Sequence, residues 1–468
     1  MLFRSSVGRI VSGSGGVLRC GSLETPVTEI STDSRRLKPG ACFLALEGER
    51  FDGHDFVQSA IDAGVSAVVL RREKLGAMNL NHREGTAIIE VEDTLRALGF
   101  LAREHRLGFA IPVVGIGGSN GKTSTKEMVA RILGQRRTVL KNPGNLNNLI
   151  GVPLTLLSLD GLHEAAVVEM GINVPGEMER LVDISRPTVG LLTNIHPAHL
   201  EGLGSLDQIL EEKGKLLTHL TTNDLAVVNL DDELIAERAR TLKARVVTFS
   251  STDPCADVRL SSPVRFSEGF STFSLALGSV TYPIRLPVLG AHQVHNAVAA
   301  AAVAWGIGEP IESIVNGLAA HQAVQQRMQL HRLSHDRLLV DDTYNANPRS
   351  MLAAIETVLA ASGGRPVVAI LGDMRELGKD SVALHQGVGE AIGGRDVTQL
   401  ITLGETGCEI GHGAVSSGFS ASHWTHVPTH EAAVDWIRDH CPEEAWILVK
   451  GSRGMTMERI VQGILRLE

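Results

Sequence analysis

The amino-acid sequence predicts an α/β protein built around parallel sheets. Short runs of aliphatic or β-branched residues alternate with segments of helical spacing through most of the chain, the pattern of strands that helices cover on both faces. One strand-to-helix junction carries the ten residues GIGGSNGKTS at 115–124. They follow an apolar run at 111–115 and precede a helical segment at 122–133 that Gly134 closes. A strand, a glycine-rich loop, Lys-Thr and a helix form the arrangement that wraps a nucleotide phosphate.

This phosphate loop contains the first candidate site residues. Glycines let the backbone approach a phosphate, and the loop N–H groups and the helix N-terminus attract its oxygens. Lys122 is placed to reach the β- and γ-phosphates, and the Thr123 hydroxyl to hold Mg²⁺. The spacing is irregular, because Ile116 stands where the standard pattern has its first glycine. The alternative is therefore a glycine-rich turn that binds nothing. The candidate nucleotide-binding residues are Gly118, Ser119, Asn120, Gly121, Lys122, Thr123 and Ser124.

Length and composition narrow the class of protein. A chain of 468 residues is too long for one core, so two or three domains are expected. A net charge of −9 argues against a nucleic-acid-binding surface. No apolar run reaches the roughly 18 residues of a spanning helix, and the first residues lack the apolar stretch of a signal peptide. The five cysteines form no CxxC pair, which suits a reducing compartment without a zinc site. We expect a cytoplasmic protein that does not enter a membrane.

Three blocks of the chain, 1–108, 109–323 and 324–468, differ in their pattern of predicted strands and helices. The first block mixes short strands at 42–46 and 66–70 with a helix at 56–63. In the second block, polar and apolar residues alternate over 244–290, which predicts a small antiparallel insert. The parallel strands predicted in the second block are 111–115, 165–170, 188–193 and 225–229.

The last block is a second α/β unit. A strand at 337–341 leads to Asn347 and Pro348, which are an N-cap and a first helical residue, and a helix follows at 349–361. Strands are predicted beyond it at 366–371, 399–403 and 445–449, and helices at 382–392, 431–440 and 455–467.

Polar residues at the carboxyl ends of these strands are candidates for chemistry, because ligands bind at that edge of a parallel sheet. Glu169 ends one strand and offers a hard oxygen ligand for Mg²⁺; a solvated acid is the alternative. His196 and His199 follow another strand, but no third ligand with zinc spacing accompanies them. Lys213 lies on a predicted helix, where an exposed lysine would be ordinary.

Two segments of the last block also carry polar clusters at strand ends. VDDTYNANPRS at 340–350 contains Asp342, Tyr344 and Asn345, and only Asn347 of this segment has a ready structural explanation. KGSRGM at 450–455 places Lys450 and Arg453 beside a helix start. Two cations there are suited to clamp a carboxylate or a phosphate; a basic loop is the alternative.

Taken together, these segments resemble the Mur ligases of bacterial cell-wall synthesis over nearly the whole chain. The phosphate loop shares the shifted glycine spacing of that family. The other segments that carry the resemblance are STDSRRLKPG with CFLALEGERFDGHDF (31–56), PGNLNNLIGVPLTLL (143–157), DDTYNANP (341–348), ILGDMRELG (370–378) and VKGSRGM (449–455). The last four are typical of the branch that adds D-alanyl-D-alanine. The resemblance implies a three-domain architecture: a UDP-sugar-peptide domain over 1–108, a central P-loop ATP domain over 109–323, and a C-terminal Rossmann-like domain over 324–468.

The resemblance also implies an ATP-dependent amide ligase that acts through an acyl phosphate. Its substrates would be UDP-N-acetylmuramoyl-tripeptide and D-alanyl-D-alanine, with two Mg²⁺ sites and a lysine carbamate at Lys213. The matching residues are Glu169, His199 and Lys213 for metal, Asn296, Arg327 and Asp342 for ATP, Ser34 and Arg35 for the uridine nucleotide, Asn145, Asn147 and Asn148 for the muramoyl peptide, and Tyr344, Asn345, Lys450 and Arg453 for the dipeptide side.

Two residues depart from the family pattern. Gln293 stands where an asparagine is usual, and His196 stands where glycine is common. A ligase of the same superfamily with another amino acid or folate as substrate stays open as an alternative, and so does a P-loop switch or motor. A monomer is the default expectation.

Overall fold

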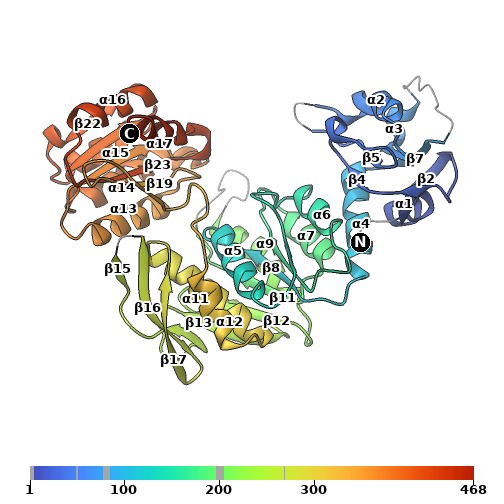
Figure 1. Cartoon of the computed structure of the whole chain (residues 1–468), viewed down its shortest axis with the longest axis horizontal. Coiled ribbons are helices and arrows are strands. Elements are labelled where there is room, and N and C mark those ends of the chain that lie inside the picture. The colour runs from blue at the N-terminus through green and yellow to red at the C-terminus, as the bar shows by residue number, and fades with distance from the viewer. Residues whose placement is uncertain (1–4, 49–50, 77–84, 197–204, 268) are drawn as a thin grey trace.

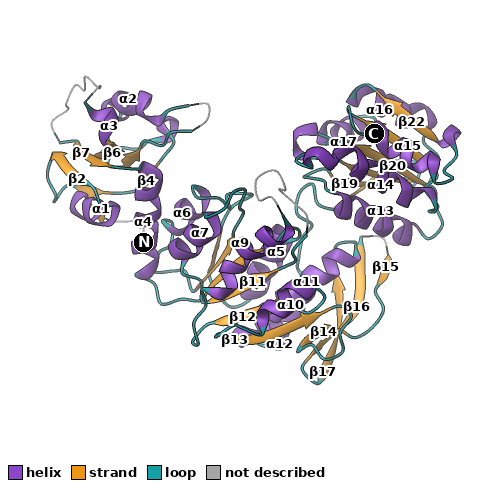
Figure 2. Ribbon diagram, turned by 180° about the vertical axis from the view of Figure 1, so that it is seen from behind, coloured by secondary structure: helices purple, strands orange, loops and turns teal. Residues whose placement is uncertain are grey.

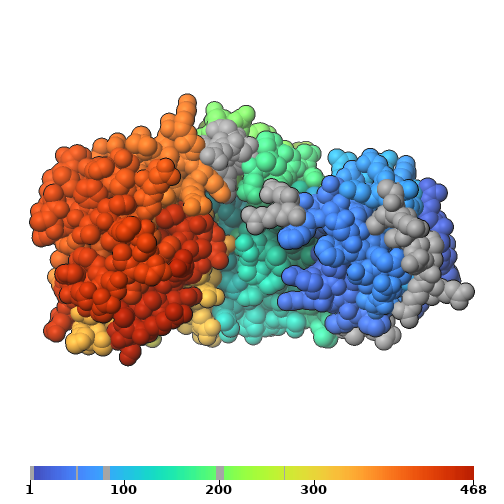
Figure 3. Space-filling model, turned by 90° about the horizontal axis from the view of Figure 1, so that it is seen from above, coloured from blue at the N-terminus to red at the C-terminus, as the bar shows by residue number. Residues whose placement is uncertain are grey.

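The computed structural model describes residues 5–48, 51–76, 85–196, 205–267 and 269–468, which form three lobes in chain order (Figure 1). The N-terminal and C-terminal lobes lie at opposite ends of the middle lobe (Figure 3). Among the described residues, the three lobes contain sheets of five, ten and six strands, and a two-stranded pair joins β1 (Ser5–Ser6) to β3 (Pro26–Val27). Most neighbouring strands are parallel, so the predicted α/β class is confirmed. The exact limits predicted for the domains stay predictions.

The N-terminal sheet has the strand order β2-β7-β6-β5-β4, and only β2 is antiparallel to its neighbour. The predicted strands appear as β5 and β6, and the predicted helix at 56–63 appears as α2, which a 3-10 turn at Gly53–Phe56 precedes. Helix α4 packs on α6 and α7 of the middle lobe and links the two lobes. The elements are α1 (Val7–Ser14), β2 (Val17–Cys20), β4 (Ile30–Ser31), β5 (Cys42–Leu44), α2 (Val57–Asp62), β6 (Ala67–Arg71), α3 (Arg72–Leu75), β7 (Ala87–Val91) and α4 (Thr94–Leu107).

The middle sheet runs β15-β16-β14-β13-β12-β11-β8-β10-β9, with β17 beside β16. It is parallel from β9 to β14 and antiparallel beyond. The antiparallel insert predicted at 244–290 is therefore wrong for its first part, because β13 pairs in parallel with β12 and β14 pairs in parallel with β13. The strands are β8 (Val113–Gly117), β9 (Val139–Lys141), β10 (Ala165–Glu169), β11 (Val189–Leu192), β12 (Leu225–Asn229), β13 (Arg245–Ser250), β14 (Val258–Leu260), β15 (Arg265–Ser267), β16 (Phe270–Leu277) and β17 (Val280–Leu286).

Helices cover both faces of this sheet (Figure 2). One apolar core joins a face of the sheet to α5, α11 and α12, and a second core joins the other face to α6, α7, α9 and α10. This double coverage explains why the central strands are aliphatic along their whole length. The helices are α5 (Lys122–Leu133), α6 (Gly151–Leu156), α7 (Glu177–Ser185), α9 (Leu206–Thr218), α10 (Glu233–Ala239), α11 (Ala291–Ile307) and α12 (Ile311–Ala319).

The C-terminal sheet has the order β18-β19-β23-β20-β21-β22 and is parallel except at β18. Asn347 caps α13 with a capping box and Pro348 at its start, as the sequence predicts. The elements are β18 (Gln329–Arg332), β19 (Leu338–Asp342), α13 (Pro348–Ser362), β20 (Val367–Gly372), α14 (Ser381–Gly393), β21 (Gln399–Leu403), α15 (Cys408–Ser416), β22 (Trp424–Val427), α16 (His430–His440), β23 (Trp446–Lys450) and α17 (Glu458–Leu465). In the part of the chain that the structure describes, no helix combines the length and apolarity needed to cross a bilayer.

Candidate active site

A cavity of about 1100 Å³ lies where the carboxyl ends of the middle strands meet the C-terminal lobe. It collects most of the residues predicted from the sequence, although they come from positions more than 300 residues apart. The predicted residues that line it are Gly118, Ser119, Asn120, Gly121, Lys122, Thr123, Ser124, Asn145, Asn147, Asn148, Glu169, Lys213, Asn296, Arg327, Asp342, Tyr344, Asn345 and Lys450.

Three of the predicted residues that the structure describes do not line this cavity, and a fourth predicted residue lies outside the described part of the chain. Ser34 and Arg35 lie on a 3-10 turn of the N-terminal lobe, where the Arg35 guanidinium donates to Asp33 and lowers the pKa of that carboxyl to about 2. Arg453 is exposed and donates to Gln326 and Glu458. His199 lies outside the described residues.

The irregular spacing of the phosphate loop follows from where β8 ends. Ile116 is a fully buried strand residue that pairs with β10 and β11, so the loop begins only after Gly117. Gly118 and Gly121 have φ of 134° and 81°, which side chains other than glycine rarely adopt. A Cβ atom at Gly121 would also collide with the side-chain oxygen of Asn296. The glycines are therefore required where the chain turns, two residues later than the strand prediction implied.

Lys122 opens α5, and its ammonium folds back over the loop. Its Nζ donates to the carbonyl oxygens of Gly118 and Ser119 at 2.8 and 3.2 Å. Burial lowers the pKa of Lys122, and the nearby Arg327 cation lowers it further, against the opposing effect of Glu169. A cation held over a glycine-rich loop at the start of a helix is suited to bind a phosphate.

Glu169, at the end of β10, joins three segments of the cavity wall. Its Oε1 accepts hydrogen bonds from Thr123 Oγ1 at 3.1 Å and from Asn147 Nδ2 at 2.8 Å. Its Oε2 is buried without a hydrogen-bond partner and lies 3.5 Å from the ammonium of Lys126, which is fully buried. A hydroxyl and a carboxylate with a free oxygen form a set of hard ligands suited to Mg²⁺.

Lys213 on α9 is also buried, with only 2 % of its surface exposed. Its Nζ donates to Ser119 Oγ at 2.9 Å, and no carboxylate pairs with it among the described residues. Burial lowers the pKa of Lys213 well below its usual value, and the charge of Lys122 adds to that effect. The alternative interpretation, that Lys213 is an ordinary exposed lysine on a helix, is therefore wrong.

His196 lies beside this lysine and faces the C-terminal lobe. Ser119 Oγ donates to the His196 carbonyl oxygen at 2.9 Å, and Arg349 of the C-terminal lobe lies 3.2 Å from His196 Nδ1. Burial, assisted by the Arg349 cation, lowers the pKa of His196 to about 4. The histidine is therefore neutral near pH 7.

The C-terminal lobe contributes Arg327 to the phosphate loop. Its guanidinium donates to Thr123 Oγ1 at 3.2 Å and lies 4.1 Å above the ring of Tyr344. Gln326 and Met328 on either side have φ of 60° and 52°, so this turn holds a strained backbone. Asn347 makes a second contact between the lobes, because its Nδ2 donates to Asn120 Oδ1 at 2.8 Å. The loop is thus held by both lobes.

Asp342 and Lys450 pair with each other across β19 and β23. The Lys450 ammonium, 3 % exposed, lies 2.6 Å from Asp342 Oδ2 and also donates to the Asn345 carbonyl oxygen. Asp342 Oδ1 accepts from the Met328 N–H at 3.1 Å. Both residues therefore have structural partners that the sequence did not suggest.

Replacing Asp342 with asparagine is expected to lower the free energy of unfolding of the C-terminal lobe by about 3 kcal/mol, because it leaves the buried Lys450 ammonium unpaired. Urea unfolding followed by tryptophan fluorescence measures this, since Trp424, Trp436 and Trp446 all lie in this lobe. The control is Glu431→Gln, which breaks an exposed pair with Arg459 and should cost less than about 1 kcal/mol. Equal costs for the two variants would contradict the prediction.

Several cavity residues were not predicted from the sequence. His295 on α11 forms two hydrogen bonds in the cavity wall. Its Nε2 lies 3.1 Å from Asn229 Nδ2, and its Nδ1 lies 2.9 Å from Ser251 Oγ. Gln293, a departure from the family pattern, leaves its side-chain oxygen buried without a partner. Asn229 ends the predicted strand 225–229, so the rule that polar strand ends face the ligand would have found it. The others depend on how α11 packs, which no local pattern encodes.

Three family models match consecutive parts of the chain. They are described as "Mur ligase family, catalytic domain" over residues 26–106, "Mur ligase middle domain" over 116–304, and "Mur ligase, glutamate ligase domain" over 326–453. A curated relative from Escherichia coli (strain K12), named UDP-N-acetylmuramoyl-tripeptide--D-alanyl-D-alanine ligase, is 35% identical over 437 residues and covers 93% of both chains.

Solved structures agree with this match. A crystal structure of MurF from Acinetobacter baumannii has a TM-score of 0.90 and 31% identity, and the alignment covers 99% of each chain. A MurF ligase structure from Thermotoga maritima, solved in complex with ADP, has a TM-score of 0.83 and 28% identity over 94% of this chain and 97% of that one. With this identity over nearly the full length of both chains, the protein belongs to the Mur ligase family.

Proposed function

We propose that this chain is an ATP-dependent ligase that joins D-alanyl-D-alanine to the C-terminal carboxylate of UDP-N-acetylmuramoyl-tripeptide. The products would be ADP, phosphate and UDP-N-acetylmuramoyl-pentapeptide, a precursor of peptidoglycan. The names of the relatives and the ADP complex of the Thermotoga maritima protein support this activity. The observation that carries it is a single cavity in which Lys122, Glu169 and Lys213 of the middle lobe face Arg327 of the C-terminal lobe.

Thr123 and Glu169 fit a Mg²⁺ ion, because the Thr123 hydroxyl lies 3.1 Å from Glu169 Oε1 and the other carboxylate oxygen, Oε2, is buried without a hydrogen-bond partner. Mg²⁺ bound there would offset negative charge on the phosphates of ATP. Asn147 donates to Oε1 of the same carboxylate, which leaves Oε2 available to a metal ion. The ATP base would lie near Asn296, which borders the phosphate loop at Gly121.

Lys213 is suited to carry the carbamate that the family resemblance implies. Its lowered pKa favours the neutral amine, which is the form that attacks CO₂. The new N–C bond and loss of the amine proton give an anion with two oxygen donors. Together with His199, which lies outside the described residues, this carbamate would hold a second Mg²⁺. An ammonium could not ligate a cation at all.

The chemical problem is that a carboxylate is a poor electrophile. Transfer of the γ-phosphoryl group of ATP to the tripeptide carboxylate gives an acyl phosphate, and the amine of D-alanyl-D-alanine then attacks its carbonyl carbon. The tetrahedral intermediate expels phosphate and leaves the amide. Lys122 and Arg327 would offset charge on the transferred group, and the two lobes around the cavity would exclude water from the acyl phosphate.

The remaining predicted residues would hold the two substrates. Asn147 is already tied to Glu169, and Asn148 Oδ1 accepts from the N–H groups of Ile150 and Gly151 at the start of α6. This arrangement links the peptide side of the cavity to the metal side. We assign the uridine nucleotide to Ser34 and Arg35, the muramoyl peptide to Asn145, Asn147 and Asn148, and the dipeptide to Tyr344, Asn345, Lys450 and Arg453.

One assay separates this function from its alternatives. The full chain is incubated with ATP, Mg²⁺ and UDP-N-acetylmuramoyl-tripeptide, with or without D-alanyl-D-alanine, and both ADP and peptide product are measured. We expect sustained ADP release only with both substrates, with one ADP formed per amide bond. ADP release at the same rate with and without D-alanyl-D-alanine would indicate a switch or motor. Turnover only with a dipeptide precursor and a free amino acid, or with folate, would indicate another ligase of the superfamily.

A further inference from the structure

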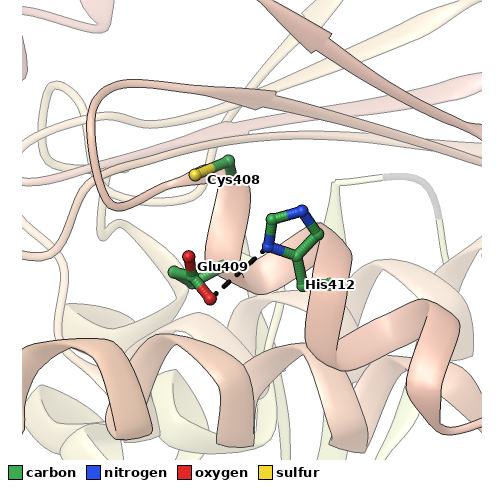
Figure 4. A group of neighbouring side chains, drawn as sticks. All are labelled: Cys408, Glu409 and His412. Carbon is green, nitrogen blue, oxygen red and sulfur yellow. Dashed lines mark ion pairs between the residues drawn. The ribbon is translucent and has the colours of Figure 1, made fainter.

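Cys408, Glu409 and His412 lie on the first turns of α15, outside the candidate active site (Figure 4). One sulfur, one carboxylate oxygen and one imidazole nitrogen from these side chains all lie within 4.8 Å of one another. None of the three lines the 1100 Å³ cavity. We propose that Cys408, Glu409 and His412 bind a divalent transition-metal ion of the zinc class, at a site separate from the Mg²⁺ positions.

The spacing of these residues places them on one face of the helix. Cys408 and His412 are four residues apart, and side chains at that separation lie one above the other. The same separation joins the two histidines of the HExxH zinc motif. Glu409 lies three residues before His412, and its Oε2 is 3.5 Å from His412 Nδ1. One helical turn therefore presents all three donors.

The donor set selects the kind of ion. Thiolate, imidazole and carboxylate together suit a borderline-soft cation such as Zn²⁺ or Co²⁺, whereas Mg²⁺ prefers oxygen ligands alone. Zinc bonds of about 2.0–2.3 Å require ligand atoms that are roughly 3.3–3.8 Å apart in a tetrahedron. The present separations are at most 4.8 Å, so small side-chain rotations close the site.

Neighbouring groups already orient two of the three donors. Gln386 on α14 donates to Glu409 Oε2 at 2.8 Å. The His412 ring packs edge-on against Trp424, with ring centroids 5.1 Å apart. Outer-shell hydrogen bonds such as the one from Gln386 orient ligands in known metal sites. The hydrogen bond and the ring contact distinguish this cluster from three polar side chains that merely share an exposed helix.

The start of α15 is itself held in place. The Asp373 carboxylate accepts hydrogen bonds from the N–H groups of Thr406 and Gly407, just before Cys408. The Cys408 thiol donates to the Glu405 carbonyl oxygen at 3.3 Å. The His412 side chain is 56% exposed, so an ion reaches the site from solvent and keeps an open position for water.

The test is a titration of the reduced full chain with Co²⁺, with excess Mg²⁺ present to occupy oxygen sites. We expect a thiolate-to-cobalt charge-transfer band and quenching of Trp424 fluorescence, both reversed by Zn²⁺. Cys408→Ser and His412→Ala should each weaken binding at least about tenfold. Cys255→Ser, at an exposed cysteine in the middle lobe, should change nothing. Trp424→Phe should lose the quenching and keep the absorption band.

Binding in the Cys408→Ser/His412→Ala double variant equal to that of the unmodified chain would overturn the proposal. So would the absence of a charge-transfer band. If either variant loses helical structure by circular dichroism, Glu409→Gln replaces it, because this change removes the carboxylate charge at nearly constant size. Unchanged cobalt affinity in a folded Glu409→Gln variant would likewise exclude the three-ligand site.

Discussion

Replacing Lys122 with alanine is expected to lower the rate of ADP release by about a thousandfold in the presence of both substrates. The half-buried Lys122 side chain lies at the start of α5, and two loop carbonyl oxygens hold its ammonium over the phosphate loop. Removal of one preorganised group that offsets transition-state charge typically costs a factor of this size. The measurement is steady-state ADP release at saturating ATP.

Two further variants make this result specific. Lys243→Ala removes an exposed lysine of the same lobe and should leave the rate unchanged. Lys122→Arg keeps the charge with a different shape and should recover part of the lost rate. Full ADP release by the Lys122→Ala variant would show that the phosphate loop does not act on the transferred group.

Replacing Lys213 with alanine is expected to lower amide formation by about a hundredfold or more, because it removes the proposed carbamate and with it a ligand for the second Mg²⁺. The carbamate has a direct signature. The unmodified chain, equilibrated with ¹³C-labelled bicarbonate, should give a carbamate resonance in ¹³C NMR, and the Lys213→Ala variant should not.

The matched control for this change is Lys215→Ala, two residues along α9. Lys215 pairs with Glu212 at 2.8 Å, and that pair favours the ammonium by raising the pKa of Lys215. Lys215 should therefore form no carbamate, and its loss should leave the rate nearly unchanged. If Lys213→Ala loses activity while the unmodified chain shows no carbamate resonance, Lys213 acts as an amine and the proposed metal ligand is wrong.

Local patterns predicted the parts of the fold that local physics determines. The strands at 225–229 and 399–403 have the predicted limits, because each is an aliphatic run bounded by turn residues. Asn347 and Pro348 start α13 as predicted, because capping is a property of a few adjacent residues. The prediction of an antiparallel insert at 244–290 was partly wrong. Alternation of polar and apolar residues indicates a strand but does not reveal whether its neighbour runs parallel or antiparallel to it.

The candidate site was predicted from strand ends and family motifs, and most of its residues meet in one cavity. What the sequence could not reveal is pairing between distant residues. Asp342 and Lys450 were predicted as separate ligand contacts, yet they neutralise each other. Cys408, Glu409 and His412 were not predicted as metal ligands, because they form neither a CxxC nor an HxxH pattern. The separation of four residues between Cys408 and His412, which places both on one face of a helix, was the signal in the sequence that could have identified them.

Lys126 has a consequence for the charge of the proposed metal site. Its ammonium is fully buried, donates to the carbonyl oxygens of Asn142 and Gly144, and lies 3.5 Å from Glu169. This internal cation balances the Glu169 charge before any ligand arrives, so the lobe folds without an uncompensated carboxylate. If Glu169 holds Mg²⁺ as proposed, the Lys126 ammonium would weaken the attraction of this carboxylate for the ion, and the phosphates of the nucleotide would supply the remaining negative charge.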